Sequence, residues 1–222
     1  QKGGVGKTTT VINLAAGLSM RGKKILVIDL DPQGNATTGL GLSNTENSDQ
    51  TIYSVLNGNK KISQVIQTTK FENLDLITSN VHLSGLEVET AGDSRRAFIL
   101  KDELRAYLND SGAPYNYIFI DCPPSLSLLT IMALVASDAL VVPLQTEFFA
   151  LEGLTQLMKT IERIKNNLNP ELSIRGILLT MYDKRNKLSG EVEREARNYF
   201  KDKVYQTIVP RNVRLSEAPS HG

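Results

Sequence analysis

Short runs of consecutive apolar residues alternate along the chain with longer stretches in which apolar positions recur every three or four residues. Two of the runs, Ile25–Asp29 and Tyr117–Asp121, are apolar at almost every position, which is typical of parallel strands buried on both faces. The longer stretches have the spacing of amphipathic helices. This alternation predicts an α/β fold with a mostly parallel sheet and helices on both of its faces.

The same two patterns predict the other elements. Further strands are expected at 74–78, 139–144, 176–180 and 204–209, and helices at 8–20, 97–108, 126–136, 151–168 and 190–201, with a weak helix at 81–90. Residues 36–70 are rich in Gly, Ser, Asn and Thr and predict surface loops and short helices, one of them around 52–56. A chain of 222 residues can bury a full core, so we predict a single domain over residues 1–222.

The two ends of the sequence lie in segments of loop-like composition. The chain begins at Gln1, inside a glycine-rich turn of the kind that normally follows a buried strand, and it stops at Pro219–Gly222. We therefore expect an N-terminal strand and a C-terminal helix to lie outside this sequence.

Charge is distributed unevenly, although the net charge is only +1. Residues 1–172 contain 15 Lys and Arg against 18 Asp and Glu, net −3, whereas residues 173–222 contain 10 against 6, net +4. The basic C-terminal portion is either a face that binds a polyanion or ordinary solvated surface.

Cysteine content and hydropathy exclude several classes of protein. The single cysteine, Cys122, excludes an internal disulfide and a multi-cysteine zinc or iron–sulfur site within one chain. No apolar run approaches the roughly 18 residues of a membrane span, and we expect no signal peptide. We expect a cytoplasmic protein without a membrane partner.

The first ten residues form the strongest motif. Three glycines, Gly3, Gly4 and Gly6, stand directly before a predicted helix, and glycine lets an anion approach a helix N-terminus closely. Lys7 can reach the terminal phosphates of a nucleotide, and the Thr8 hydroxyl can bind the magnesium that accompanies them. The segment predicts a site for a nucleoside triphosphate.

The motif also departs from the usual P-loop, which has a glycine where this chain has Gln1. The segment Lys2-Gly3-Gly4-Val5-Gly6-Lys7-Thr8-Thr9 instead resembles the deviant Walker A motif of the ParA/MinD class of ATPases. The resemblance implies ATP and Mg²⁺ as cofactors, with the residues from Gly3 to Thr9 around the phosphates. It further implies an ATP-dependent homodimer in which Lys2 reaches the nucleotide of the partner subunit, so that Lys2 and Lys7 both serve catalysis.

Two aspartates follow the first predicted strand, in the segment Asp29-Leu30-Asp31-Pro32-Gln33-Gly34-Asn35. Carboxylates at this end of a strand lie where open α/β sheets bind ligands. Asp31 is our candidate for positioning the attacking water, because phosphoryl transfer depends mainly on placing the nucleophile. Asp29 would support either magnesium or the geometry of the loop. In the ParA class this segment is switch I.

Asp121 ends another buried strand, in Ile118-Phe119-Ile120-Asp121-Cys122-Pro123-Pro124-Ser125, which resembles a Walker B segment. Magnesium keeps most of its waters and takes few protein ligands. We therefore expect Asp121 to hold the ion opposite Thr8 through a bound water.

The C-terminal half resembles the chromosome-partitioning ParA (Soj) branch in Gly176–Arg185 and in Lys203–Gly222, and the likeness runs over the whole chain. By this resemblance Glu147 lies near the nucleotide and the dimer interface. The purine contacts are implied for Met181, Asp183, Pro210 and Asn212, and DNA contacts for Arg185 and Arg214.

The resemblance implies a DNA-segregation ATPase. Its ATP-bound dimer would hold nonspecific DNA at the nucleoid and release it when a centromere-binding protein of the ParB/Spo0J type stimulates hydrolysis. The alternative is a positioning ATPase that acts on a membrane or a protein cargo; a MinD-like protein would need a C-terminal amphipathic helix. A third class, biosynthetic ligases and the nitrogenase iron protein, shares the loop, but the iron protein needs two ligating cysteines per subunit and this chain has one.

Overall fold

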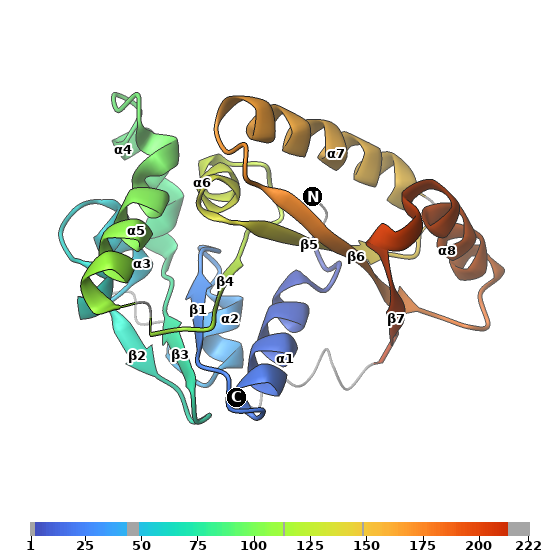
Figure 1. The fold of residues 1–222 in the computed structure, drawn as a ribbon, viewed down its shortest axis with the longest axis horizontal. Helices are drawn as coiled ribbons and strands as arrows, with labels where there is room; N and C mark the ends of the chain where they lie inside the picture. Colours follow the sequence, from blue (N-terminus) through green and yellow to red (C-terminus); the bar gives the residue numbers. More distant parts are fainter. Residues whose placement is uncertain (1–2, 44–48, 113, 148, 213–222) are drawn as a thin grey trace. The chain divides into compact units, whose positions relative to one another are not determined.

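A computed structural model describes residues 3–43, 49–112, 114–147 and 149–212 (Figure 1). Lys2 and Arg214, both predicted site residues, lie outside the described residues. Contacts group the chain into two compact units, and each unit is described by itself. The four-stranded unit lies within residues 8–136, and the three-stranded unit combines residues 3–7 with residues from 137 onward.

The four-stranded unit contains a sheet with the strand order β2-β3-β1-β4. Its strands are β1 (Ile25–Asp29), β2 (Ile66–Thr68), β3 (Leu74–Ile77) and β4 (Tyr117–Asp121). Its α-helices are α1 (Lys7–Ser19, which enters this unit at Thr8), α2 (Asn35–Gly39), α3 (Ile52–Leu56), α4 (Leu86–Glu89), α5 (Ile99–Ser111) and α6 (Leu128–Ala136). Its short 3₁₀ helices are η1 (Ile62–Gln64), η2 (Val81–Gly85) and η3 (Arg96–Phe98).

Strand β1 is the centre of this sheet. It pairs in parallel with β3 and with β4, whereas β2 pairs antiparallel with β3 at the edge. The register places Asp29 directly beside Asp121, so both carboxylates stand in one row where β1 and β4 end. The carboxyl edge of a parallel sheet is where ligands bind in folds of this kind.

Helices cover both faces of this sheet because the side chains of β1 alternate between two apolar clusters. Leu26 and Ile28 belong to a cluster with residues of α3, α5 and α6, and Ile25 and Val27 belong to another with residues of α1 (Figure 1). All four side chains are fully buried. Burial on both sides explains why the strand is a continuous apolar run.

The three-stranded unit contains a parallel sheet with the order β5-β6-β7. Side chains on one face of its strands share an apolar cluster with residues of both long helices. Its elements are β5 (Ala139–Gln145), β6 (Ser173–Tyr182), β7 (Val204–Pro210), α7 (Ala150–Asn167), α8 (Lys187–Phe200) and the 3₁₀ helix η4 (Lys201–Lys203).

The predicted fold class is confirmed. Four of the five strand pairings among the described residues are parallel, and apolar strands alternate there with amphipathic helices. The expected surface loops of residues 36–70 contain in addition the edge strand β2, and α2 begins at Asn35 just before them. The prediction of a single domain stays a prediction.

Candidate functional site

The glycine loop leads directly into α1. Gly4 and Gly6 have φ angles of 77° and 88°, a conformation that strains any residue with a Cβ. The Thr180 hydroxyl of β6 donates a 2.9 Å hydrogen bond to the carbonyl oxygen of Val5 and so fixes the loop within the three-stranded unit. Helix α1 then begins at Lys7, and the first turn of a helix presents backbone N–H groups to an anion. This is the local geometry of a phosphate-binding loop.

Asp29 is fully buried at the end of β1, and both of its carboxylate oxygens accept hydrogen bonds from the chain. Oδ1 accepts one from the Asp31 N–H at 3.1 Å, and Oδ2 accepts two from the N–H and the hydroxyl of Thr37, both at 2.7 Å. Burial raises the pKa of Asp29 to about 6, against the lowering effect of these hydrogen bonds. Of the two roles predicted for Asp29, this arrangement supports the one in loop geometry.

Asp31 is nearly buried, and its backbone and side chain are fixed separately. Its carbonyl oxygen accepts hydrogen bonds from the Ser79 hydroxyl at 2.5 Å and the Gly34 N–H at 2.9 Å. Its Oδ1 accepts the Gln33 N–H at 3.0 Å. Within the described part of the chain no hydrogen bond reaches its other oxygen, Oδ2, which is the atom that a water molecule could contact.

Asp121 is the last residue of β4 and lies at the same edge of the sheet. It is 1% exposed, lies in register with Asp29, and accepts the Leu30 N–H on its carbonyl oxygen at 2.9 Å. A carboxylate in this place suits a hard cation such as Mg²⁺, which prefers oxygen ligands and keeps several waters. Across the residues that the structure describes, no group of three or more His, Cys, Asp or Glu is placed to hold a metal ion. A magnesium ion that arrives with a nucleotide needs no such group.

The residues implied for the purine come together where β6 and β7 end. Met181 has a φ of 51°, and the next residue, Tyr182, pairs with Pro210. The Tyr182 carbonyl also accepts the Arg211 N–H at 3.0 Å. Asp183 follows on this turn, and Asn212 lies two positions beyond Pro210 in the chain. The structure therefore brings together Met181, Asp183 and Pro210 within one unit.

Arg185 is paired with Asp183 in this structure. Its Nε and a terminal nitrogen donate to the two carboxylate oxygens of Asp183, each at 3.1 Å, and its backbone N–H donates to Oδ1 at 3.0 Å. These hydrogen bonds hold the pKa of Asp183 below its ordinary value and raise that of Arg185. The Arg185 side chain is 91% exposed, so it remains accessible to a polyanion.

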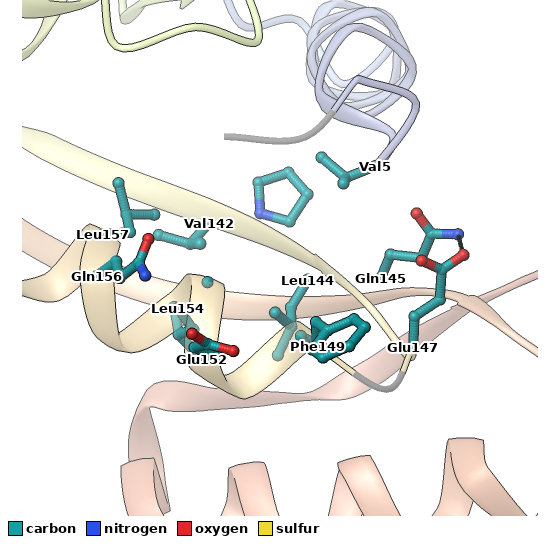
Figure 2. Close-up of a pocket in the computed structure, with 13 residues that line it drawn as sticks. Val5, Val142, Leu144, Gln145, Glu147, Phe149, Glu152, Leu154, Gln156 and Leu157 are labelled. Atoms are coloured by element: carbon teal, nitrogen blue, oxygen red, sulfur yellow. Dashed lines mark hydrogen bonds between the residues drawn. The ribbon is translucent and has the colours of Figure 1, made fainter.

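A cavity of about 300 Å³ lies between β5 and the first half of α7 (Figure 2). Its wall includes two predicted nucleotide contacts, Val5 of the glycine loop and Glu147, together with Phe149. Gln145 donates a hydrogen bond to Glu147, so the carboxylate is held beside the end of β5. The cavity shows that the glycine loop and Glu147 belong to one hollow of the three-stranded unit.

The predicted residues thus fall into two groups. Thr8, Thr9 and the three aspartates lie in the four-stranded unit, and Gly3 to Lys7, Glu147 and the residues of the β6 and β7 ends lie in the three-stranded unit. Sequence reasoning missed Thr37 and Ser79, which are both fully buried and both donate hydrogen bonds to residues 29–35, here called the aspartate loop. Thr37 lies near the motif in sequence, but nothing in the sequence near Ser79 indicates its contact with a loop 48 residues away.

Helices of the described ranges are all too short or too polar to cross a membrane.

The chain is similar to known proteins over its whole length. A family model for the AAA domain matches residues 1–174. The chain is 53% identical to the chromosome partitioning protein ParA of Caulobacter vibrioides and 50% identical to the sporulation initiation inhibitor protein Soj of Bacillus subtilis. Both matches span all 222 residues, which correspond to 82% of the first relative and 86% of the second.

A solved structure shares the fold. Cobyrinic acid a,c-diamide synthase from Mycobacterium smegmatis, with bound ADP and magnesium, superimposes with a TM-score of 0.86 at 33% sequence identity. The match covers 99% of this chain and 88% of that protein.

Proposed function

The chain belongs to the family of the ParA and Soj partitioning proteins, and from that premise we propose that it is a magnesium-dependent ATPase that segregates DNA. In this proposal two ATP-bound copies form a dimer, and the dimer binds DNA without regard to its sequence. A centromere-binding protein of the ParB/Spo0J type then stimulates hydrolysis, and the DNA is released.

The observation that carries the ATPase proposal is the glycine loop. Its left-handed glycines run into α1, whose first two residues are Lys7 and Thr8. A lysine and a hydroxyl at these positions are the groups that contact the terminal phosphates and the magnesium of a bound nucleotide. The ADP and magnesium in the related diamide synthase support the same ligands here.

In this proposal each of the following site residues has a separate part in the reaction. Lys7 and the backbone N–H groups of the loop stabilise the charge on the phosphates, and Lys2 does the same for the nucleotide of the other copy. Thr8 and Asp121 would hold a magnesium ion, which would supply neutralisation of the phosphate charge. Asp31 orients the attacking water through Oδ2, the oxygen that the loop leaves available.

DNA binding is assigned to Arg185 and Arg214, in the portion of the chain with net charge +4. The exposure of Arg185 supports this assignment. Such contacts reach phosphates rather than base edges, so affinity would fall steeply with salt and vary little with sequence.

A second candidate function is biosynthetic, because the diamide synthase shares the fold at 33% identity. The two partitioning relatives, at 50% and 53% identity, favour segregation. A third candidate, positioning of a membrane or protein cargo, uses the same ATPase.

Binding assays with DNA and with anionic liposomes separate these functions. With Mg·ATP, we expect the protein to bind a DNA duplex of arbitrary sequence and to leave anionic liposomes unbound, and with ADP to bind neither. Binding to liposomes alone would replace segregation by membrane positioning. Binding to neither surface with ATP would favour the biosynthetic class.

A further inference from the structure

Four residues at the carboxyl edge of the four-stranded sheet form a closed ring of hydrogen bonds. Asp31 donates its N–H to Asp29, and Asp31 accepts the hydroxyl of Ser79 on its carbonyl oxygen. Ser79 donates its own N–H to the Thr37 hydroxyl at 3.1 Å, and that hydroxyl donates to Asp29. Each hydroxyl has one hydrogen and uses it once, so the ring is consistent at every atom.

Ser79 is the member that comes from elsewhere in the chain. Asp29, Asp31 and Thr37 belong to β1, the loop after it and α2, whereas Ser79 follows β3. It lies 48 residues from Asp31 and 42 from Thr37, and it contacts one with its hydroxyl and the other with its backbone N–H. Ser79 therefore ties both ends of the aspartate loop to the neighbouring strand.

The ring leaves Asp31 little freedom. All four members are at most 6% exposed, so water does not compete for these bonds. Removing one partner from a buried hydrogen bond leaves the other unsatisfied, and the loop would shift to recover it. Phosphoryl transfer is sensitive to such shifts, because a displacement of about 1 Å in a positioning group can cost about 100-fold in rate.

We propose that Ser79 is a positioning residue for ATP hydrolysis, acting with Thr37 to hold Asp31 where its Oδ2 orients the attacking water. The inference rests on the proposed function of Asp31. It assigns to the end of β3 a part in the reaction, although Ser79 itself contacts neither nucleotide nor water in this mechanism.

The test compares kcat, the Kd for ATP and the Tm of matched variants in the full chain. We expect Ser79→Ala to lower kcat about 10-fold, because one anchor of the loop is lost, with the Kd for ATP changed less than twofold. Ser19→Ala is the matched control. Ser19 is also buried, and its hydroxyl also donates to a backbone carbonyl, at 2.9 Å, but it lies at the end of α1 outside the ring. The kcat of the Ser19→Ala variant should equal that of the wild type.

A second pair of variants tests the ring through Thr37. Thr37→Val keeps the shape of the side chain and removes the hydroxyl, so it should also lower kcat about 10-fold, whereas Thr37→Ser should restore the rate. If Ser79→Ala fails to fold, this pair decides alone. The double variant Ser79→Ala with Thr37→Val should have about the same kcat as either single variant, because both substitutions open the same ring of hydrogen bonds.

The outcomes separate this inference from the function on which it rests. Slow hydrolysis by Asp31→Ala together with wild-type kcat for Ser79→Ala, or for Thr37→Val, would overturn the positioning role alone. A parallel loss of ATP affinity would also overturn it, since the ring would then serve binding. Unchanged hydrolysis by Asp31→Ala would overturn the role of Asp31 and the positioning role of Ser79 with it. Absence of Mg·ATP hydrolysis by the wild type would overturn the proposed function itself.

Discussion

Two parallel strands, β1 and β6, lead into turns with the same local hydrogen bond but opposite surroundings. In each turn an aspartate accepts the backbone N–H of the residue two positions later, Asp29 from Asp31 and Asp183 from Arg185. Asp29 is fully buried and its pKa is raised to about 6, whereas hydrogen bonds from the exposed Arg185 lower the pKa of Asp183. The first turn is therefore held by buried hydrogen bonds, whereas the Arg185 side chain of the second turn is 91% exposed and accessible from solvent.

The largest expected effect concerns the buried turn and pH. Because the pKa of Asp29 is about 6 in the folded chain, against an ordinary value of 3.8 for an aspartate, the folded state binds the proton more tightly than the unfolded chain does. Asp29 therefore lowers the free energy of unfolding progressively as pH rises from about 4 to 6, by about 3 kcal/mol in total.

The measurement is the free energy of unfolding of the wild type and of Asp29→Asn, without nucleotide or magnesium. The wild type should lose stability relative to the variant between pH 4 and 7. A difference that stays constant with pH would show that Asp29 titrates as an exposed carboxylate and that the contrast between the turns is absent.

The next effect concerns catalysis at the same turn. Asp31→Ala should lower kcat for Mg·ATP about 100-fold, because the group proposed to orient the water is lost, while the Kd for ATP stays near the wild-type value. Rates from single turnovers and nucleotide affinities from a fluorescent analogue measure both quantities. Wild-type turnover by this variant would remove Asp31 from the mechanism.

A smaller effect is expected at the exposed turn. Arg185→Glu should weaken the binding of nonspecific DNA about 10-fold at low salt and make the salt dependence shallower by about one phosphate contact. Arg95→Glu is the matched control, since Arg95 is also an exposed arginine bonded to an aspartate, Asp102 at 2.9 Å, but in the four-stranded unit. Equal losses for the two variants would indicate a general effect of net charge.

The smallest effect separates exposed from half-buried ion pairs within the three-stranded unit. Arg185→Ala should leave the Tm unchanged, because its pair with Asp183 is solvated. Arg197→Ala should lower the free energy of unfolding by about 0.5 kcal/mol, and therefore the Tm, because Arg197 and its partner Glu193 are each only about a quarter exposed. A lower Tm for Arg185→Ala than for Arg197→Ala would reverse the comparison.

The sequence predicted the elements whose own residues determine them. The bounds of β1 and β4 agree with the prediction because both strands are continuous apolar runs, and α3 agrees as well. Helix α8 begins at Lys187 rather than 190, since the Asn186 side chain accepts the Leu188 N–H and caps it earlier. Strand β2, with only three residues and one buried neighbour strand, has too little pattern to be recognised.

The candidate site shows the same limit. Asp29, Asp31 and Asp121 could be placed at the strand ends because each follows an apolar run. Helix α2, with the sequence Asn-Ala-Thr-Thr-Gly, has low intrinsic helix propensity and is held by the two bonds from Thr37 to Asp29. Ser79 could not be predicted, because its role depends on the pairing of β3 with β1, which brings distant residues together.

The central proposal is that hydrolysis by this partitioning ATPase depends on DNA and on a ParB-type partner. The most direct measurement is the rate of Mg·ATP hydrolysis with and without DNA and a peptide from a cognate ParB-type protein. We predict a low basal rate and strong stimulation only when DNA and the peptide are both present. A fast rate that neither addition changes would contradict it.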